Sequence, residues 1–428
     1  MKVKKILPLL ALSLVLSSCT NGLSSTSARR KTADYTLLVY MCGSNLESEY
    51  ANQTFVDGYR WNGRGLATLD LREIISTPKQ PKDVNILIET GGSNVWTTNK
   101  YGKYGKYDIN PEKLQIHRVK NQKIVLDKEM QYASMGESST LQTFLEYGLK
   151  KYPAKRTALV LWNHGGGLQG CCNDEVTNDN LLGYEVIDAV SNALINTGHE
   201  GEKLEWIGYD ACLMAVQDVA ELNSHYFNYM VASEETENGY GWYYTSWIEK
   251  MYEHATTPEI LDSLCTSFIN YYGGTENSQN DQTISWLDLS KMENYKTAFE
   301  NMAGELDNLI NTTNRSSFKS FVNSCNSYGG DYYPLYGLYD VKDFIDKIES
   351  EDNVLFHVDS SYTSAVTNAL RQLVKKSLCG AGAGPSHGLS MFYAYNGATK
   401  NYNHYNDTKT TNFSTWASLV NTYGGLGW

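Results

Sequence analysis

The chain has 428 residues, a formal net charge of −12 and 32 tyrosines. Such an acidic protein is a poor electrostatic partner for nucleic acid or for an anionic membrane surface. Its length exceeds that of a usual single-domain core, so we expect one enlarged α/β domain with a smaller helical addition.

The first 18 residues have the pattern of a targeting segment. Three lysines precede a mostly apolar run over residues 6–16, which is too short to span a membrane. The sequence Leu-Ser-Ser-Cys that follows is typical of a bacterial lipobox and predicts that Cys19 is lipidated; an ordinary signal peptide cut nearby is the alternative. Residues 19–34, which are rich in Ser and Thr, are predicted to form a flexible tether.

Strands and helices alternate over residues 35–250, which predicts a mostly parallel sheet with helices on its faces. Strands are expected at 35–41, 84–90, 158–162, 206–209 and 228–232, a hairpin at 114–126, and helices at 138–152, 184–196 and 213–225. Residues 251–428 are predicted to form a helical subdomain. A helical stretch expected within 242–274 crosses the start of this subdomain. Its other expected elements are helices within 295–324, 340–348 and 359–378, a strand at 283–287 and a returning strand at 389–395.

A histidine follows one of the buried strands directly. Five apolar residues, Ala158 to Trp162, precede Asn163, His164 and three glycines. Glycines let the backbone approach a ligand closely and leave its N–H groups accessible. His164 is therefore a candidate base, and an incidental surface histidine beside a glycine turn is the alternative. His387 is a second candidate base, but no comparable strand and glycine run surround it.

A cysteine follows the next predicted strand. Trp206 to Tyr209 is read as that strand, and Cys212 then lies where the strand gives way to the predicted helix at 213–225. In open α/β sheets ligands bind at the carboxyl ends of the strands, and a helix N-terminus favours a thiolate. A buried, inert cysteine is the alternative for Cys212 alone. Together with His164, however, it fits the Cys–His arrangement of covalent catalysis.

The loop from Gly165 to Gly183 lies between these two blocks. It contains Cys171, Cys172 and three acids but no basic residue. Its carboxylates suit calcium, yet their spacing matches no defined calcium loop, so we expect a solvated loop and no cofactor, with calcium as the alternative. Six cysteines besides Cys19 and Cys212 allow 15 disulfide patterns, among which the sequence does not choose.

These blocks together resemble the clostripain family of cysteine peptidases, whose clan includes caspases, legumain and gingipains. Further stretches share the resemblance, in order: residues 35–47, 231–242, 334–344 and 388–393. The resemblance implies a caspase-like mostly parallel sheet with an added helical C-terminal region. It also implies a peptidase that acts with a Cys–His dyad on peptides or proteins.

The resemblance also assigns residues to the substrate. The N–H groups of Gly165 and Cys212 become candidate oxyanion donors, and Asp210 becomes an acid of the substrate pocket. The family commonly has an acid before the Gly-Trp pair that favours cleavage after Arg or Lys; here that position is Tyr240. Tyr240 is expected to shape the pocket and Glu234 is a further candidate acid, so cleavage after basic residues is a hypothesis.

The sequence therefore predicts an exported endopeptidase, anchored by lipid to a membrane of a bacterial cell envelope and otherwise free of the membrane. The alternative is a lipid-anchored protein that binds peptides or glycans on a peptidase scaffold, because a fold does not guarantee its chemistry. His164 and Cys212 favour the peptidase, whereas the many tyrosines also suit the binding protein.

Overall fold

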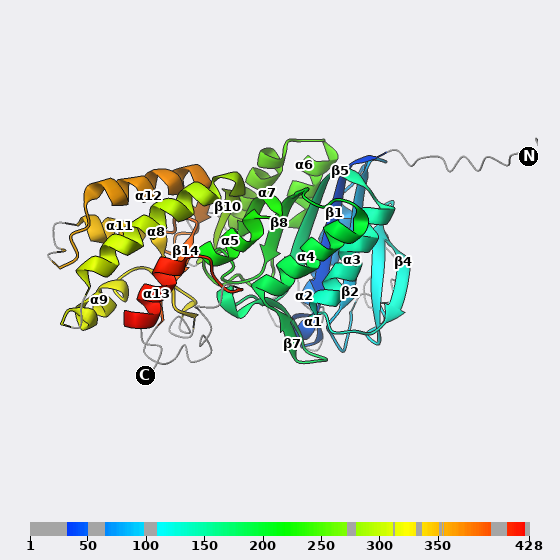
Figure 1. Cartoon of the computed structure of the whole chain (residues 1–428). Helices are drawn as coiled ribbons and strands as arrows, with labels where there is room; N and C mark the ends of the chain where they lie inside the picture. Colours follow the sequence, from blue (N-terminus) through cyan, green and yellow to red (C-terminus); the bar gives the residue numbers. More distant parts are fainter. Residues whose placement is uncertain are drawn as a thin grey trace, which may run out of the picture. The chain divides into compact units, whose positions relative to one another are not determined.

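Five buried, mainly apolar strands form the parallel centre of a nine-stranded sheet in the computed structural model (Figure 1). Runs of this kind suit strands that are covered on both faces. The parallel strands are β2 (Val84–Gly91), β1 (Ala33–Cys42), β5 (Ala154–Trp162), β8 (Leu204–Asp210) and β9 (Phe227–Ala232).

Antiparallel strands extend both edges of this sheet. The complete order is β13-β10-β9-β8-β5-β1-β2-β3-β4. The outer strands are β3 (Lys113–Val119), β4 (Ile124–Gln131), β10 (Thr283–Asp288) and β13 (Val374–Cys379). The predicted hairpin is thus confirmed as β3 and β4, and the mostly parallel sheet with flanking helices is confirmed as the fold class.

The structure describes residues 32–49, 65–97, 109–271, 280–310, 313–330, 336–350, 353, 355–394 and 409–423. Residues 32–428 form one unit and residues 1–31 another. The predictions for residues 1–18 and for Cys19 lie outside the described residues, as does most of the predicted tether. Within the described ranges, no helix combines the length and the apolar composition needed to cross a membrane.

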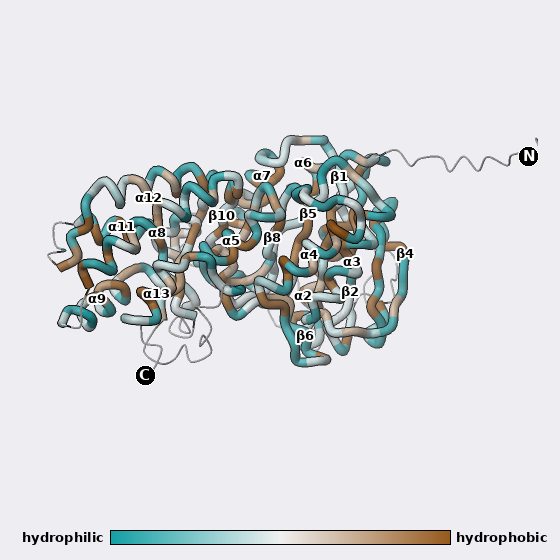
Figure 2. The backbone as a smooth tube through the Cα atoms, viewed as in Figure 1, coloured by the Kyte–Doolittle hydropathy of each residue, from teal (hydrophilic) through white to brown (hydrophobic). Residues whose placement is uncertain are grey.

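Helices cover both faces of the sheet and bury its alternating side chains in two cores. Along β1, Leu38 and Tyr40 face the core that includes α3, α4 and α5, whereas Leu37 and Val39 face the core of α2, α6 and α7. The bounds are α1 (Ser44–Ser48), α2 (Leu66–Ser76), α3 (Ser138–Lys151), α4 (Gly183–Thr197), α5 (Gln217–Ser224), α6 (Tyr244–Tyr252) and α7 (Thr257–Tyr271). Figure 2 shows the apolar stretches of these strands within the layers of helices.

The C-terminal region contributes strands as well as helices. Its helices are α8 (Met292–Leu309), α9 (Arg315–Val322), α11 (Val341–Glu349), α12 (Ser360–Leu373) and α13 (Ser414–Tyr423). A second sheet contains β11 (Ser327–Tyr328), β12 (Leu338–Asp340) and β14 (Ser390–Phe392). β10 and β14 match the strands predicted at 283–287 and 389–395. Because β10 and β13 belong to the main sheet, that sheet crosses the proposed boundary at residue 250, and the division into two domains stays a prediction.

Two predicted helices are too long. The helix expected over 359–378 ends at Leu373, because the next six residues pair with β10 as β13. The helix expected over 213–225 begins only at Gln217. Before it, Leu213 has φ +66°, and its N–H bonds to the carbonyl of Glu235 instead of starting a helix. Tertiary hydrogen bonds thus override a helical pattern of apolar residues.

The loop after β5 folds into a small ladder of β6 (Cys171–Asp174) and β7 (Asp179–Leu181). Its buried acid, Asp174, accepts hydrogen bonds from the Tyr132 hydroxyl and from the N–H groups of Met135 and Val176. Among the described residues, no group of three or more acidic, histidine or cysteine side chains could hold a metal ion. The seven cysteines of the described ranges are free thiols.

Candidate active site

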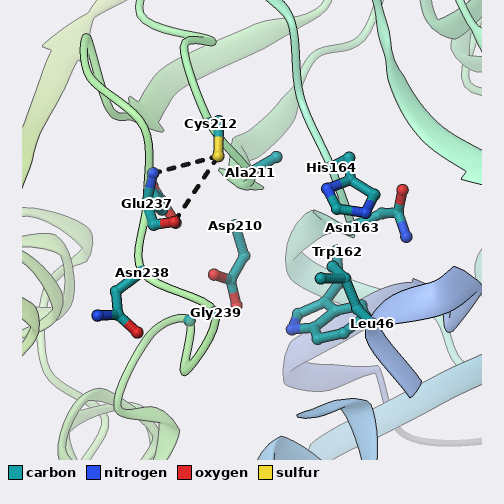
Figure 3. A pocket seen from close by; sticks show the side chains of 11 residues that line it. Leu46, Trp162, Asn163, His164, Asp210, Ala211, Cys212, Glu237, Asn238 and Gly239 are labelled. Carbon is teal, nitrogen blue, oxygen red and sulfur yellow. Dashed lines mark hydrogen bonds between the residues drawn. The ribbon is translucent and has the colours of Figure 1, made fainter. Parts of the chain in front are cut away.

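The ends of β5 and β8 bring the two candidate catalytic side chains together. Trp162 pairs with Asp210 in parallel register, and His164 and Cys212 each lie two residues further along. Both side chains line one cavity of about 200 Å³ (Figure 3). Its lining consists of Leu46, Trp162, Asn163, His164, Asp210, Ala211, Cys212, Glu237, Asn238, Gly239 and Gly241. The structure thus brings together the two residues that the sequence singled out as a candidate catalytic pair.

Gly165 allows the two strand ends to approach. A Cβ atom added at this position would lie 2.2 Å from the carbonyl oxygen of Cys212, a separation that real side chains do not tolerate. The histidine loop and the cysteine loop can thus pack backbone against backbone only with glycine here.

The Cys212 thiol is held by the backbone of Glu237. The Glu237 N–H donates to Cys212 Sγ over 3.2 Å, and the thiol faces the Glu237 carbonyl oxygen at 3.8 Å (Figure 3). Burial raises the pKa of the Cys212 thiol, and N–H groups of Glu237, Cys212 and Gly165 oppose that rise. Stabilisation of a thiolate by the helix N-terminus is therefore a wrong expectation, because α5 begins five residues after Cys212.

His164 is oriented by a residue that the sequence did not single out. Its Nε2 lies 2.7 Å from Oδ1 of Asn45, which also accepts a hydrogen bond from the Ser44 hydroxyl. Because an amide oxygen only accepts, Nε2 carries the proton and Nδ1 is the basic nitrogen. Burial lowers the pKa of His164, so its imidazole is neutral at neutral pH. In Figure 3 the His164 ring lies across the cavity from Cys212.

Two carboxyl groups line the cavity, and a third lies beside it. Asp210 accepts hydrogen bonds from the Tyr244 hydroxyl at 2.7 Å and the Trp242 N–H at 3.2 Å, and burial raises its pKa to about 7. Glu237 receives a weaker bond from the Trp242 indole N–H at 3.4 Å. A Cβ atom at Gly241, which has φ +60°, would lie 3.0 Å from both Asp70 Oδ2 and Asp210 Oδ1. The base of the cavity is thus rich in acids.

The other candidate residues lie elsewhere. Tyr240 does not line the cavity, and its backbone N–H bonds to the side chain of Asn238. Glu234 is buried and accepts hydrogen bonds from the Ser386 hydroxyl and the Gly388 N–H, so it ties this segment to the C-terminal region. His387 forms an ion pair with Asp340 at 2.9 Å and is absent from the cavity lining.

A cysteine and a histidine at the ends of neighbouring parallel strands, facing one acid-lined cavity, define a cysteine peptidase of caspase-like fold. The chain belongs to the clostripain family, whose family model matches residues 39–422. The resemblance seen in the sequence is thereby confirmed.

Individual relatives are distant in sequence but similar throughout the chain. Clostripain from Hathewaya histolytica is 23% identical in an alignment of 467 positions that covers 95% of this chain and 84% of that protein. A secreted C11 cysteine protease from Bacteroides thetaiotaomicron superposes with a TM-score of 0.63 at 14% identity, and an inactive zymogen C11 protease from Parabacteroides distasonis with 0.60 at 18%. Each alignment covers 90% of this chain and 99% of the other. These structures show that the fold is shared.

Replacing Asn45 should disturb the orientation and the basicity of His164. We expect Asn45→Ala to lower kcat by about tenfold to a hundredfold, part of the 10²–10⁴ that a positioned base supplies. The Asn45 oxygen stabilises the protonated imidazole, so its removal should lower the pKa of His164. The acidic limb of the pH–rate profile should therefore move to lower pH.

Two matched variants make this test specific. Asn45→Asp keeps an acceptor at this place, so it should restore activity and move the acidic limb to higher pH. Ser44→Ala removes the other donor to the same oxygen and should change little. A folded Asn45→Ala protein with the kcat and pH profile of the wild type would show that Asn45 does not act on His164.

Proposed function

We propose that this clostripain-family cysteine peptidase cleaves peptide bonds with Cys212 as the nucleophile and His164 as the general acid and base. The main support for this proposal is that both side chains line the same cavity from adjacent strand ends. The raised pKa of the thiol and the lowered pKa of the imidazole favour a neutral pair in the resting enzyme. Nδ1 of His164 then takes the thiol proton when a substrate is attacked.

Each proton and bond in this mechanism has an assigned group. The Cys212 sulfur adds to the peptide carbonyl carbon, and the oxyanion receives hydrogen bonds from the N–H groups of Gly165 and Cys212. Both N–H groups lower the pKa of the thiol through hydrogen bonding to the sulfur, which supports this role. His164 next protonates the leaving amine, and water activated by His164 hydrolyses the thioester.

The acids of the cavity support cleavage after Arg or Lys. A buried cationic side chain requires a paired charge, and Asp210 and Glu237 can each provide a carboxylate in the cavity. Asp70 adds a third carboxyl group beside Gly241. These three carboxyl groups can supply the negative charge that position 240, a tyrosine here, does not. We therefore propose a preference for cleavage after basic residues.

Export with a lipid anchor is proposed from the first 19 residues of the sequence. The apolar run and the lipobox before Cys19 support it. One structural neighbour is described as a secreted protease, which is consistent with export. The proposed substrates are accordingly peptides or proteins outside the inner membrane.

The catalytic pair is tested by single and double substitution. Cys212→Ala and His164→Ala should each lower kcat/KM by about a thousandfold or more, and the double variant should be little worse, because both residues act in one covalent step. Cys379→Ala, which alters another partly exposed thiol, should retain activity. Robust hydrolysis by a folded Cys212→Ala protein would refute the assignment and leave a binding protein as the better account.

The preference for basic residues should depend on pH. Since burial raises the pKa of Asp210 to about 7, its carboxyl is neutral below that pH and charged above it. We expect kcat/KM for an Arg substrate to rise through pH 7 relative to its citrulline isostere. Asp210→Asn should remove this rise and lower the Arg preference by about tenfold or more. An identical pH dependence for both substrates in the wild type would contradict the proposal.

Lipidation is tested on the full precursor. Cys19→Ala should abolish incorporation of a metabolic lipid label and release the protein from the membrane fraction, because an acyl anchor supplies the membrane affinity. The control is Cys379→Ala, a thiol far along the chain. Equal incorporation of the lipid label in Cys19→Ala and in the wild type would refute the lipobox assignment.

A further inference from the structure

Glu237 lies where the nucleophile and the acidic cavity meet. Through its backbone it contacts the sulfur: the N–H donates to Cys212 Sγ at 3.2 Å, and the carbonyl oxygen faces the thiol at 3.8 Å. The Glu237 carbonyl can accept a hydrogen bond from the Cys212 thiol, and the Glu237 N–H can donate one to the thiolate. The Glu237 backbone therefore suits both protonation states of Cys212.

The side chain of Glu237 lines the same cavity. Its Oε1 accepts the indole N–H of Trp242 at 3.4 Å. Its buried Oε2 receives no N–H or hydroxyl donor among the described residues, and its carboxyl is hydrogen-bonded to the carboxyl of Asp210, so the two acids share a proton. A buried pair of acids held by one shared proton is costly, and at a substrate cavity it indicates a position for a donor from a ligand. An ammonium or guanidinium group has the donors and the charge to fit.

The segment around Glu237 is held in place independently of any ligand. The Thr283 hydroxyl, at the start of β10, accepts hydrogen bonds from the N–H groups of Glu234 and Glu235. The Asn238 N–H donates to the Gln282 side chain at 2.7 Å. Contacts on both sides thus fix the Glu237 peptide group, and its donor is oriented before substrate arrives.

We propose that Glu237 performs two functions: its N–H stabilises the Cys212 thiolate, and its carboxylate pairs with a basic substrate side chain beside Asp210. The proposal rests on the proposed function in that Cys212 is taken as the nucleophile. It replaces the helix N-terminus, which lies too far along the chain, as the source of thiolate stabilisation.

These two functions are electrostatically coupled. Besides burial, the charges of Asp210 and Cys212 raise the pKa of the Glu237 carboxyl. In the empty cavity a thiolate and a Glu237 carboxylate therefore disfavour one another, and a cationic side chain between the acids relieves this repulsion. Glu237 thus links recognition of a basic residue to ionisation of the nucleophile.

The test measures thiol ionisation without peptide hydrolysis. Iodoacetamide, a small neutral reagent, alkylates the full chain at pH 7 to pH 12, and mass spectrometry follows the peptide that contains Cys212. In Glu237→Pro the N–H donor is gone, and the midpoint of alkylation should rise by about one pH unit, the order expected for one hydrogen bond to a charged group. Glu237→Gln keeps the N–H, so its midpoint should stay or fall.

The side-chain function is read from specificity. Glu237→Gln should lower the ratio of kcat/KM for Arg over citrulline substrates by about tenfold or more. Glu249→Gln is the control, because the Glu249 side chain is exposed on α6 and does not line the cavity. It should leave both the midpoint and the ratio unchanged.

Several outcomes would overturn the proposal. One is a wild-type midpoint in folded Glu237→Pro, and another is a rise in Glu237→Gln as large as in Glu237→Pro. An unchanged Arg ratio in Glu237→Gln refutes the side-chain function. If Glu237→Pro unfolds, a backbone ester at position 237 can replace it, because the ester removes the N–H alone. The alkylation midpoint of Cys212 in that protein then decides whether the N–H stabilises the thiolate. Because alkylation needs no turnover, a protein that hydrolyses no peptide refutes the proposed function while the thiolate function is still measured.

Discussion

The parallel register of β5 and β8 is the constraint on which the site depends. Pairing of Trp162 with Asp210 sets His164 and Cys212 at the same distance beyond the sheet edge, so their loops share one cavity. Gly165 lets these loops pack without a side chain between them. A slip of one residue in this register would turn the strand side chains to the opposite faces, exchanging residues between the two cores. The same pairing therefore maintains both the packing of the sheet and the geometry of the site.

The carboxyl groups of the cavity lower the stability of the fold but suit the binding of a substrate. Asp210 and Glu237 are carboxyl groups in a buried setting, and burial raises the pKa of each. Apolar residues of similar volume would avoid that cost. Acids at this place fit the proposed substrate with a cationic side chain, which can replace the proton that Asp210 and Glu237 share. The neutral resting state of Cys212 and His164 fits the same view, since the site becomes charged only when it is occupied.

The sequence predicted those features that depend on local pattern. Apolar runs located the parallel strands, and the residues that follow two of them, His164 and Cys212, were identified because a strand end is visible in the sequence. Asn45 and Glu237 were not chosen as site residues, because their roles depend on contacts across 119 and 25 residues of chain. The late start of α5 escaped notice for the same reason, because the backbone before it bonds to the segment of Ser233 and Glu235. Tyr240 was expected at the pocket from its place beside Gly241, but the turn presents Gly241 and Glu237 to the cavity instead.

Cys212 is proposed as a nucleophile that faces an acid-lined substrate cavity. The most direct test of this role is covalent labelling of the full chain with an electrophilic peptide that ends in an arginyl group, followed by mapping of the modified residue by mass spectrometry. We expect one adduct, on Cys212, that is absent from Cys212→Ala and forms more slowly with a probe of the same length that ends in a neutral group. Labelling of another residue, or equal labelling of Cys212→Ala, would contradict the proposal.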